Sequence, residues 1–176
     1  EMTHVISVIE GVREAIGWDI DLAIDCHGQF DVPSAITLAK AVEPLRLMWL
    51  EEPVPAENID ALAQVRDSTS TIICTGENQY TRFEFIELFE KKACDVIMPD
   101  LAKAGGIAEA KRIADIADAY YIPIAPHNVS SPLGMMAACH VMASVPNFLF
   151  LEFHARFISW WSDLCEGDKP FIEDGY

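Results

Sequence analysis

The stretch I-D-C-H-G, residues 24–28, places two ionisable side chains at the end of an apolar run. The run that leads into it, residues 20–25, alternates as a half-buried strand does. Asp25 and His27 are two positions apart, so period-two geometry sends both side chains to the same side of a strand. The stretch therefore predicts a strand that presents a carboxylate suited to a metal ion beside an imidazole suited to proton transfer.

Short apolar strands that end in an ionisable residue recur along the whole chain. The strand ends are, in order, Asp25, Glu51, Glu77, Asp100, His127 and Glu152. Successive ends are 23 to 27 residues apart, and each interval holds one stretch with helical spacing of its apolar residues. Such regular units of strand, loop and helix are typical of successive βα units in a parallel sheet.

The apolar runs and the residues that interrupt them predict where these elements lie. Strands are expected at residues 20–25, 47–51, 71–75, 95–98, 122–125 and 148–151. Helices are expected at residues 1–16, 34–45, 58–65, 81–92, 107–117 and 133–144. Thr81 and Glu84 form a predicted capping box, and Ser131 is a predicted cap with Pro132 as the first helical residue. The tail beyond Glu152 has no pattern that predicts an element.

Six ionisable strand ends favour a closed barrel over a doubly wound sheet, because only a barrel points all of them at one centre. A (β/α)8 barrel has about eight such units and typically about 250 residues. This chain has 176 residues, six predicted strands and a helix in front of the first strand. We therefore expect an α/β protein with an incomplete TIM-type (β/α) barrel of about six βα units, in which residues 1–176 are the C-terminal part of a longer protein.

The composition narrows the classes of partner. Hydrophobic residues make up 51% of the chain and charged residues 23%, which is typical of a globular protein. The net charge of −16 argues against binding to nucleic acids or anionic membranes. No apolar run approaches the roughly 18 residues of a membrane span. The five cysteines are scattered without a C-x-x-C pair, which favours reduced thiols and a cytoplasmic location over a disulfide framework.

Three strand ends, Asp25, Glu51 and Glu77, are carboxylates on consecutive strands. Neighbouring strands lie about 5 Å apart, so the oxygens of these side chains can converge on one ion. An all-oxygen site suits a hard cation such as Mg²⁺, which keeps places for water and substrate. The alternative is that each carboxylate only caps the helix after it. Three equally spaced carboxylates favour the metal site.

Asp100 and His127 end the next two strands. A carboxylate beside an imidazole orients the ring and raises its basicity, so His127 is a candidate general base rather than a structural histidine. Glu152 ends the last strand. If burial keeps it protonated, it can donate a hydrogen bond to a substrate carboxylate. A metal on one carboxylate oxygen and this acid on the other would stabilise an enediolate.

The six motifs, taken in order, resemble those of the enolase superfamily, and specifically of its mandelate racemase group. They are D-x-H at 25–27, E-E-P at 51–53, G-E-N at 76–78, P-D at 99–100, P-H-N at 126–128 and L-E at 151–152. The resemblance implies a (β/α)7β barrel, a preceding α+β capping domain that is absent from this chain, and a homo-oligomer. It implies that the Mg²⁺ ligands are Asp25, Glu51 and Glu77. The Asp100–His127 dyad would remove the proton α to a carboxylate, with Glu152 as the electrophilic partner of that carboxylate.

The D-x-H pair is similar to that of the acid-sugar dehydratases in this group, especially the galactonate dehydratases. This similarity implies that His27 is the general acid that protonates the departing 3-hydroxyl. The expected enzyme is a carbon–oxygen lyase, a hydro-lyase that converts a small sugar acid to a 2-keto-3-deoxy sugar acid. The alternatives are a racemase or epimerase of a 2-hydroxy acid and a non-catalytic binding relative. Six intact strand-end residues argue against the non-catalytic relative.

A few other polar and aromatic residues keep two interpretations. Glu52 either supports a metal ligand or forms a structural ion pair. Lys103 is expected at the loop surface rather than in the cavity. His154 and the pair Trp160 and Trp161 either line the pocket or pack beside it.

Overall fold

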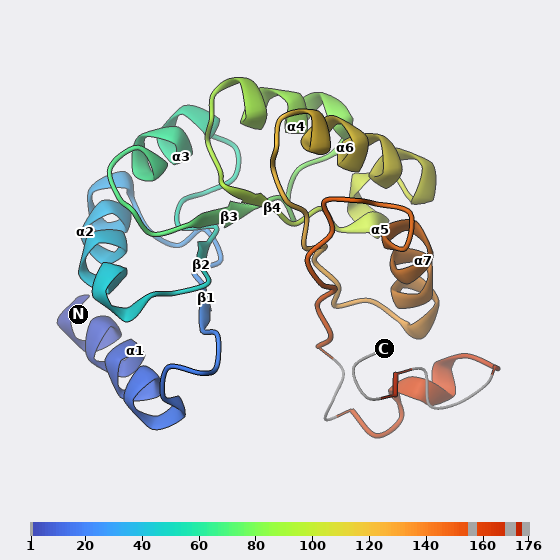
Figure 1. Cartoon of the computed structure of the whole chain (residues 1–176), viewed down its shortest axis with the longest axis horizontal. Helices are drawn as coiled ribbons and strands as arrows, with labels where there is room; N and C mark the ends of the chain where they lie inside the picture. The colour runs from blue at the N-terminus through green and yellow to red at the C-terminus, as the bar shows by residue number, and fades with distance from the viewer. Residues whose placement is uncertain (1, 155–157, 168–171, 174–176) are drawn as a thin grey trace.

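The computed structural model describes residues 2–154, 158–167 and 172–173. The chain forms an arc in which short strands line the inner side and helices cover the outer side, from α1 (Met2–Ile16) at one end to α7 (Pro132–Met142) near the other (Figure 1). Strands and helices alternate along the arc in chain order. This is the arrangement of an open (β/α) barrel, so the predicted fold class is confirmed.

In the described chain, a sheet of parallel strands has the order β1 (Ala23–Asp25), β2 (Trp49–Glu51), β3 (Ile73–Thr75) and β4 (Val96–Ile97). The register sets Asp25 opposite Glu51, and Glu51 opposite Cys74. Two isolated parallel bridges continue this order, from Ile97 to Ile124 and from Ile124 to Phe148. The six predicted strands therefore lie side by side in chain order, and their carboxyl ends meet at one edge.

The strands are shorter than predicted. The segments at 122–125 and 148–151 pair through one residue each, and Pro123 has no N–H to donate to a neighbouring strand. β1 begins at Ala23 rather than at residue 20, because the carbonyl of Ile20 accepts a hydrogen bond from the Arg13 guanidinium (2.7 Å) and not from a strand. β1 also ends at Asp25, so His27 lies beyond the strand with a φ of 50°.

The long outer helices between α1 and α7 are α2 (Val32–Val42), α3 (Ile59–Arg66), α4 (Thr81–Glu90) and α6 (Ile107–Ala119). α2 begins earlier than predicted because the Asp31 carboxylate caps it, accepting a hydrogen bond from the Ser34 N–H (2.8 Å). The predicted cap and first residue of α7, Ser131 and Pro132, are confirmed. The last three residues of the helix predicted at 34–45 form the separate 3-10 helix η1 (Glu43–Leu45). Short elements that the pattern did not predict are α5 (Leu101–Ala104) and η2 (Trp161–Leu164).

The capping box predicted at the start of α4 is wrong in one of its two partners. Glu84 accepts a hydrogen bond from the Tyr80 N–H (2.6 Å), so the glutamate half forms. The N-cap is Tyr80, however, and no side chain at that position bonds the first turn. Thr81 is the first residue of α4, and its φ is 56°. The helix starts one residue earlier than a Thr81 cap requires.

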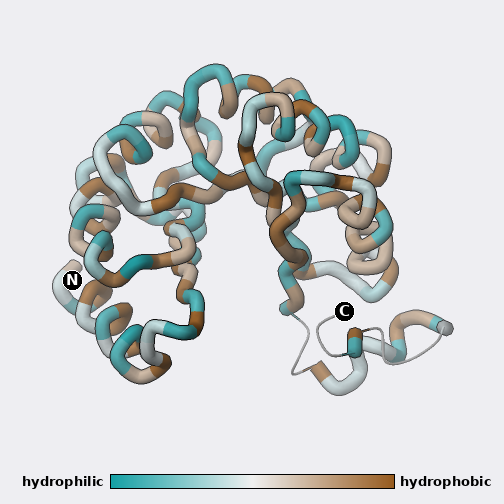
Figure 2. Tube along the Cα trace, viewed as in Figure 1, coloured by the Kyte–Doolittle hydropathy of each residue, from teal (hydrophilic) through white to brown (hydrophobic). Residues whose placement is uncertain are grey.

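The main core lies between the strands and the outer helices. Leu50, Ile73, Ile97 and Ile124, from successive strand segments, have 0% exposure and pack with helix residues such as Leu38, Leu62, Phe85 and Ile113. A second cluster is formed by the strand residues of the other face, which are Trp49, Cys74, Val96, Met98 and Ala125. Figure 2 shows hydrophobic residues along the strands and a mixed pattern on the helices. None of the described helices is long and apolar enough to cross a membrane.

The Arg13 side chain joins the end of α1 to the segments that lead into β1 and β2. Its guanidinium is buried and donates hydrogen bonds to the carbonyls of Gly17, Ile20, Leu45 and Arg46 (2.7–3.2 Å). A buried cation is stable only when its donors are satisfied, and four carbonyls satisfy this one. The contact therefore fixes where the first strand starts, and with it the position of Asp25.

Candidate active site

The carboxyl ends of the strands bring the predicted site residues to one edge of the molecule. Asp25 and Glu51 are paired in register at the ends of β1 and β2. The Cys26 N–H donates to the Glu51 carbonyl (3.0 Å), and the Glu52 N–H donates to the Cys74 carbonyl (2.9 Å), so the pairing continues just past the strands. These backbone contacts hold the acidic residues of neighbouring strands side by side.

Gly76 lets the end of β3 approach β4 closely enough to place Glu77. It has a φ of 139°, and a Cβ at this position would lie 2.8 Å from the backbone nitrogen of Met98. Only glycine fits such a close approach with this backbone conformation. The Glu77 carboxylate consequently reaches His127, with 2.7 Å between Oε2 of Glu77 and Nε2 of His127.

The Asp100–His127 dyad forms as predicted. Nδ1 of His127 and Oδ2 of Asp100 are 2.8 Å apart, and both residues are buried. The other oxygen of Asp100 accepts hydrogen bonds from the N–H groups of Ala102 (2.7 Å) and Lys103 (3.2 Å) in the first turn of α5. Asp100 thus fixes the imidazole with one oxygen and is itself fixed by the other.

The charges around the dyad stabilise its ionised forms. Burial opposes ionisation of Asp100, but the hydrogen bonds from His127, Ala102 and Lys103 hold the pKa of its carboxyl below the ordinary value. Burial likewise opposes protonation of His127. Its hydrogen bond to Asp100 and the negative charges of Glu77 and Glu152 nevertheless raise the pKa of the imidazole above 6.5. His127 is therefore a stronger base than a free histidine.

Glu152 lies beside the same imidazole, with Oε2 3.9 Å from Nε2 of His127. The Asn128 N–H donates to this carboxylate (2.8 Å), and the Asn128 amide donates to the Glu152 carbonyl (3.0 Å). The Ser130 hydroxyl in turn donates to the Asn128 amide oxygen (2.7 Å). Asn128 is thus a positioning residue that the sequence reasoning missed, although it belongs to the P-H-N motif.

Asp25 and His27 also come together, but by a different route from the predicted one. The strand ends at Asp25, and the turn after it brings Nε2 of His27 to 2.5 Å from Oδ2 of Asp25. The His27 N–H donates to the other oxygen (2.9 Å). The expectation that both residues lie on one strand face is wrong, because the left-handed backbone of His27 belongs to the turn. The imidazole side chain is 67% exposed.

Glu51 lies buried among the other carboxylates of the site. Burial, together with the negative charges of Asp25, Glu152 and Glu77, raises the pKa of its carboxyl to about 8, although a hydrogen bond from the Trp49 indole (3.3 Å) opposes the rise. The three proposed ligands are therefore close enough to repel one another. A hard divalent cation relieves such repulsion and prefers oxygen donors, so the donor chemistry fits Mg²⁺.

The side-chain orientations do not gather these donors around one point. In the described residues, no group of three or more histidine, cysteine, aspartate or glutamate side chains is arranged to hold a metal ion. The reason is visible in the contacts: both oxygens of Asp25 face His27, and Oε2 of Glu77 faces His127. The structure thus joins Glu77, Asp100, His127 and Glu152 in one cluster and leaves Asp25 with His27.

Two residues that the sequence left open, Glu52 and Lys103, lie next to this cluster. Glu52 is 2% exposed and accepts hydrogen bonds from the Asn78 amide (2.7 Å) and the Thr75 hydroxyl (3.4 Å), so it supports the G-E-N turn. Lys103 is exposed at the surface, as expected, although it lies in the short helix α5 rather than in a loop. Nζ of Lys103 lies 3.9 Å from Oε2 of Glu77 and 3.4 Å from Oδ1 of Asn78, because α5 carries it back over the strand ends.

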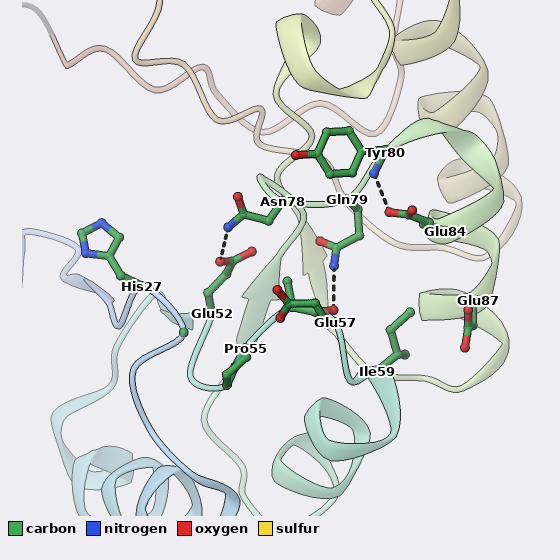
Figure 3. A pocket seen from close by; sticks show the side chains of 12 residues that line it. His27, Glu52, Pro55, Glu57, Ile59, Asn78, Gln79, Tyr80, Glu84 and Glu87 are labelled. Carbon is green, nitrogen blue, oxygen red and sulfur yellow. Dashed lines mark hydrogen bonds between the residues drawn. The ribbon is translucent and has the colours of Figure 1, made fainter.

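A cavity of about 650 Å³ opens between the loops that follow β1, β2 and β3. Figure 3 shows His27 and Glu52 on one side of it and Tyr80 and Glu84 on the other. The cavity shares His27, Glu52 and Asn78 with the site, whereas the dyad does not line it.

The aromatic tail packs beside the site instead of lining the large cavity. The Trp161 indole donates to the Ser130 carbonyl (3.0 Å), and its ring meets Phe153 edge-on. With His154 and Asn128, these residues line a small cavity of about 60 Å³. Trp160 is 60% exposed. The packing interpretation therefore describes Trp161.

Comparison with known proteins places the chain in a family. Residues 1–176 match the model of the family described as enolase C-terminal domain-like. A curated relative, D-xylonate dehydratase of Haloferax volcanii, is 47% identical over 176 residues, which are 100% of this chain and 42% of that protein. D-galactonate dehydratase of Cronobacter sakazakii is 36% identical over 84% of this chain and 38% of its own length.

Solved structures agree in fold. A mandelate racemase/muconate lactonizing enzyme-like protein from Rubrobacter xylanophilus has a TM-score of 0.90 and 59% identity, covering 92% of this chain and 41% of its own. The chain thus spans about two fifths of the length of the curated relatives it matches. By the family match over residues 1–176 and these relatives, the chain belongs to the enolase C-terminal domain-like family, in the mandelate racemase group of the enolase superfamily.

Proposed function

We propose that this chain is the C-terminal barrel portion of a Mg²⁺-dependent acid-sugar dehydratase. The substrate would be an aldonate, and the product a 2-keto-3-deoxy sugar acid and water. The observation that carries the proposal is the pair of histidines at one strand edge, His127 bound to Asp100 and His27 bound to Asp25. The curated relatives named D-xylonate dehydratase and D-galactonate dehydratase support the same substrate class.

The open edges of the arc support the expected domain organisation, residues 1–176 being part of a (β/α)7β barrel with an N-terminal capping domain. In β1, Ala23 and Asp25 are exposed. In the last segment, Leu149 is 48% and Phe150 40% exposed. Apolar strand edges of this kind are normally paired or covered. We propose that the remaining strands of the barrel cover these edges. We also propose that the complete protein is a cytoplasmic homo-oligomer.

His127 is the proposed base. Asp100 holds Nδ1, so Nε2 is the nitrogen that faces the other strand ends and can take the proton from the carbon next to the substrate carboxylate. The raised pKa of the imidazole increases the driving force for that transfer. Asp100 keeps the imidazole oriented as it gains charge.

Glu152 and the metal ligands would act on the substrate carboxylate. Glu152 is fixed beside His127 by Asn128, where a hydrogen bond to the carboxylate would strengthen as negative charge develops. Asp25, Glu51 and Glu77 would hold Mg²⁺. When bound, the ion would supply Lewis-acid stabilisation of the same charge.

His27 is the proposed acid for the second half of the reaction. Its exposed imidazole lines the cavity and contacts the Asp25 carboxylate. The C3–O bond breaks as His27 gives its proton to the leaving hydroxyl, which departs as water. The remaining enol takes up a proton at C3 and releases its O–H proton to become the 2-keto acid. His127 then gives up the α-proton to water and His27 regains a proton from water, so atoms and charge balance.

A panel of aldonates tests the proposal in the complete protein that contains this chain. We expect one or more five- or six-carbon aldonates, incubated with Mg²⁺, to give a 2-keto acid that semicarbazide detects. The same incubation in D2O separates dehydration from racemisation. A racemase would wash deuterium into unreacted substrate without forming a keto acid, and that result would replace the dehydratase proposal by the racemase one.

A further inference from the structure

Lys103 brings a cation to the strand ends that form the proposed reaction centre. Within residues 2–154, 158–167 and 172–173, it is the only lysine or arginine that forms an ion pair with one of the six strand-end side chains. Its Nζ lies 3.9 Å from Oε2 of Glu77, and Nε2 of His127 lies 2.7 Å from the same oxygen. The ammonium and the proposed base are thus neighbours of one carboxylate atom.

Hydrogen bonds hold both the backbone and the ammonium of Lys103. At the backbone, the Lys103 N–H donates to the Asp100 carboxylate (3.2 Å), and Gly105, with a φ of 118°, ends α5 immediately afterwards. At the tip, Nζ donates to Oδ1 of Asn78 (3.4 Å). A solvated surface lysine has no comparable restraints.

Asn78 is oriented so that its oxygen must face the lysine. Its amide nitrogen donates to Glu52 (2.7 Å) and to Glu77 (3.1 Å), so both donor positions are directed at carboxylates. Only the amide oxygen remains for Lys103. Glu52 is buried, and the contact anchors this amide firmly. The G-E-N turn therefore aims the lysine as well as Glu77.

The chemistry of the site explains what such an ammonium can do. An ammonium carries three N–H donors, and Asn78 engages one of them at hydrogen-bond distance. Most other polar groups at the strand ends are carboxylates, which when ionised only accept. A polyhydroxylated acid also needs donors for its hydroxyl oxygens. An ammonium would repel a nearby divalent cation, so metal binding is not what it favours.

We propose that Lys103 is a substrate-binding residue whose ammonium donates a hydrogen bond to a hydroxyl oxygen of the sugar acid. The inference rests on the proposed function, and it adds a specificity contact to it. The Lys103 side chain is 37% exposed and thus accessible to a ligand at the strand ends. A hydroxyl held there lies beside His127, so the contact sets which carbon is presented to the base.

The test compares K103M, K103R and K111M in the complete protein. Lys111 is a matched control, because its side chain is also 37% exposed but pairs with Asp115 on α6, away from the site. We expect K103M to lower kcat/KM for the best aldonate about 10- to 100-fold, the usual worth of a charged hydrogen bond. K103R should recover part of the loss, and K111M should match the wild type.

A series of monodeoxy aldonates identifies the hydroxyl. In the wild type, removing the contacted hydroxyl should cost about as much as K103M does. In K103M, removing the same hydroxyl should cost little more, because the interaction is already gone. Equal and additive losses for every monodeoxy acid would overturn the contact.

Binding measurements separate this inference from its alternatives. In an H127N background, calorimetry should show weaker aldonate binding with K103M, whereas Mn²⁺ binding should be unchanged or tighter. Weaker Mn²⁺ binding would assign Lys103 to the placement of Glu77 and overturn the substrate contact. Lysine-dependent aldonate binding without any turnover in the wild type would overturn the dehydratase alone. Absence of aldonate binding would overturn both.

Discussion

The two histidines of the site are held in opposite ways. His127 is 8% exposed, lies among Asp100, Glu77 and Glu152, and follows a strand segment that pairs through one residue. The His27 side chain is 67% exposed, and Asp25 is its partner among the strand-end residues. The backbone of His27 is left-handed and belongs to the turn after β1. A buried, cross-braced imidazole is suited to remove a proton from a weak carbon acid. An exposed one is suited to exchange its proton with water between turnovers.

The largest effect should come from the buried histidine. H127N removes the proposed base, so we expect turnover to fall about 10⁴-fold, the upper range for one acid–base group. Exchange of the α-proton in D2O should disappear with it. Metal binding, followed with Mn²⁺, should change little, because asparagine keeps a polar side chain of similar size. Retained α-proton exchange in H127N would remove His127 from the first half of the reaction.

The exposed histidine should affect only the second half. H27N leaves the Asp100–His127 dyad intact, so α-proton exchange should continue while keto-acid formation falls about 10³-fold. The measurement is the ratio of deuterium incorporation to product under identical conditions. Because His27 is exposed and outside the strand, the fold should be unaffected. Parallel loss of exchange and product would show that the two histidines do not divide the reaction.

Much of the surroundings of the buried His127 was predictable from the sequence, and less of the surroundings of the exposed His27. Strand ends follow from apolar periodicity, so the spacing located Asp100, His127 and Glu152 before any contact was known. The turn at His27 depends on local left-handed backbone, which period-two reasoning does not describe. The contacts of Lys103 and Asn128 were missed because they are hydrogen bonds between segments about 25 residues apart. Sequence spacing carries no record of such contacts.

Substitution of Asp100 tests how this carboxylate sets the pKa and the orientation of His127. D100N removes a negative charge that raises the pKa of His127. With the amide oxygen held by the N–H groups of Ala102 and Lys103, it also turns an N–H donor toward the imidazole in place of an acceptor. The pKa should therefore fall, and the acidic limb of kcat/KM should move to lower pH, because the base is deprotonated over a wider range. Turnover at its optimum should fall about 10²-fold, since the imidazole loses its orientation. The histidine titration can be followed by NMR.

The smallest expected effects come from two turn glycines, Gly76 near His127 and Gly28 near His27. A Cβ on Gly76, beside the buried cluster, would lie 2.8 Å from the Met98 backbone, and G76A should cost about 2 kcal/mol. A Cβ on Gly28, beside His27, would lie 3.2 Å from Cα of Pro55, with a φ of 62°, and G28A should cost about 1 kcal/mol. Urea unfolding measures both. G76A should also weaken Mn²⁺ binding, because it moves Glu77. If G28A instead weakened Mn²⁺ binding more than G76A, the exposed side would be the one that fixes the metal ligands.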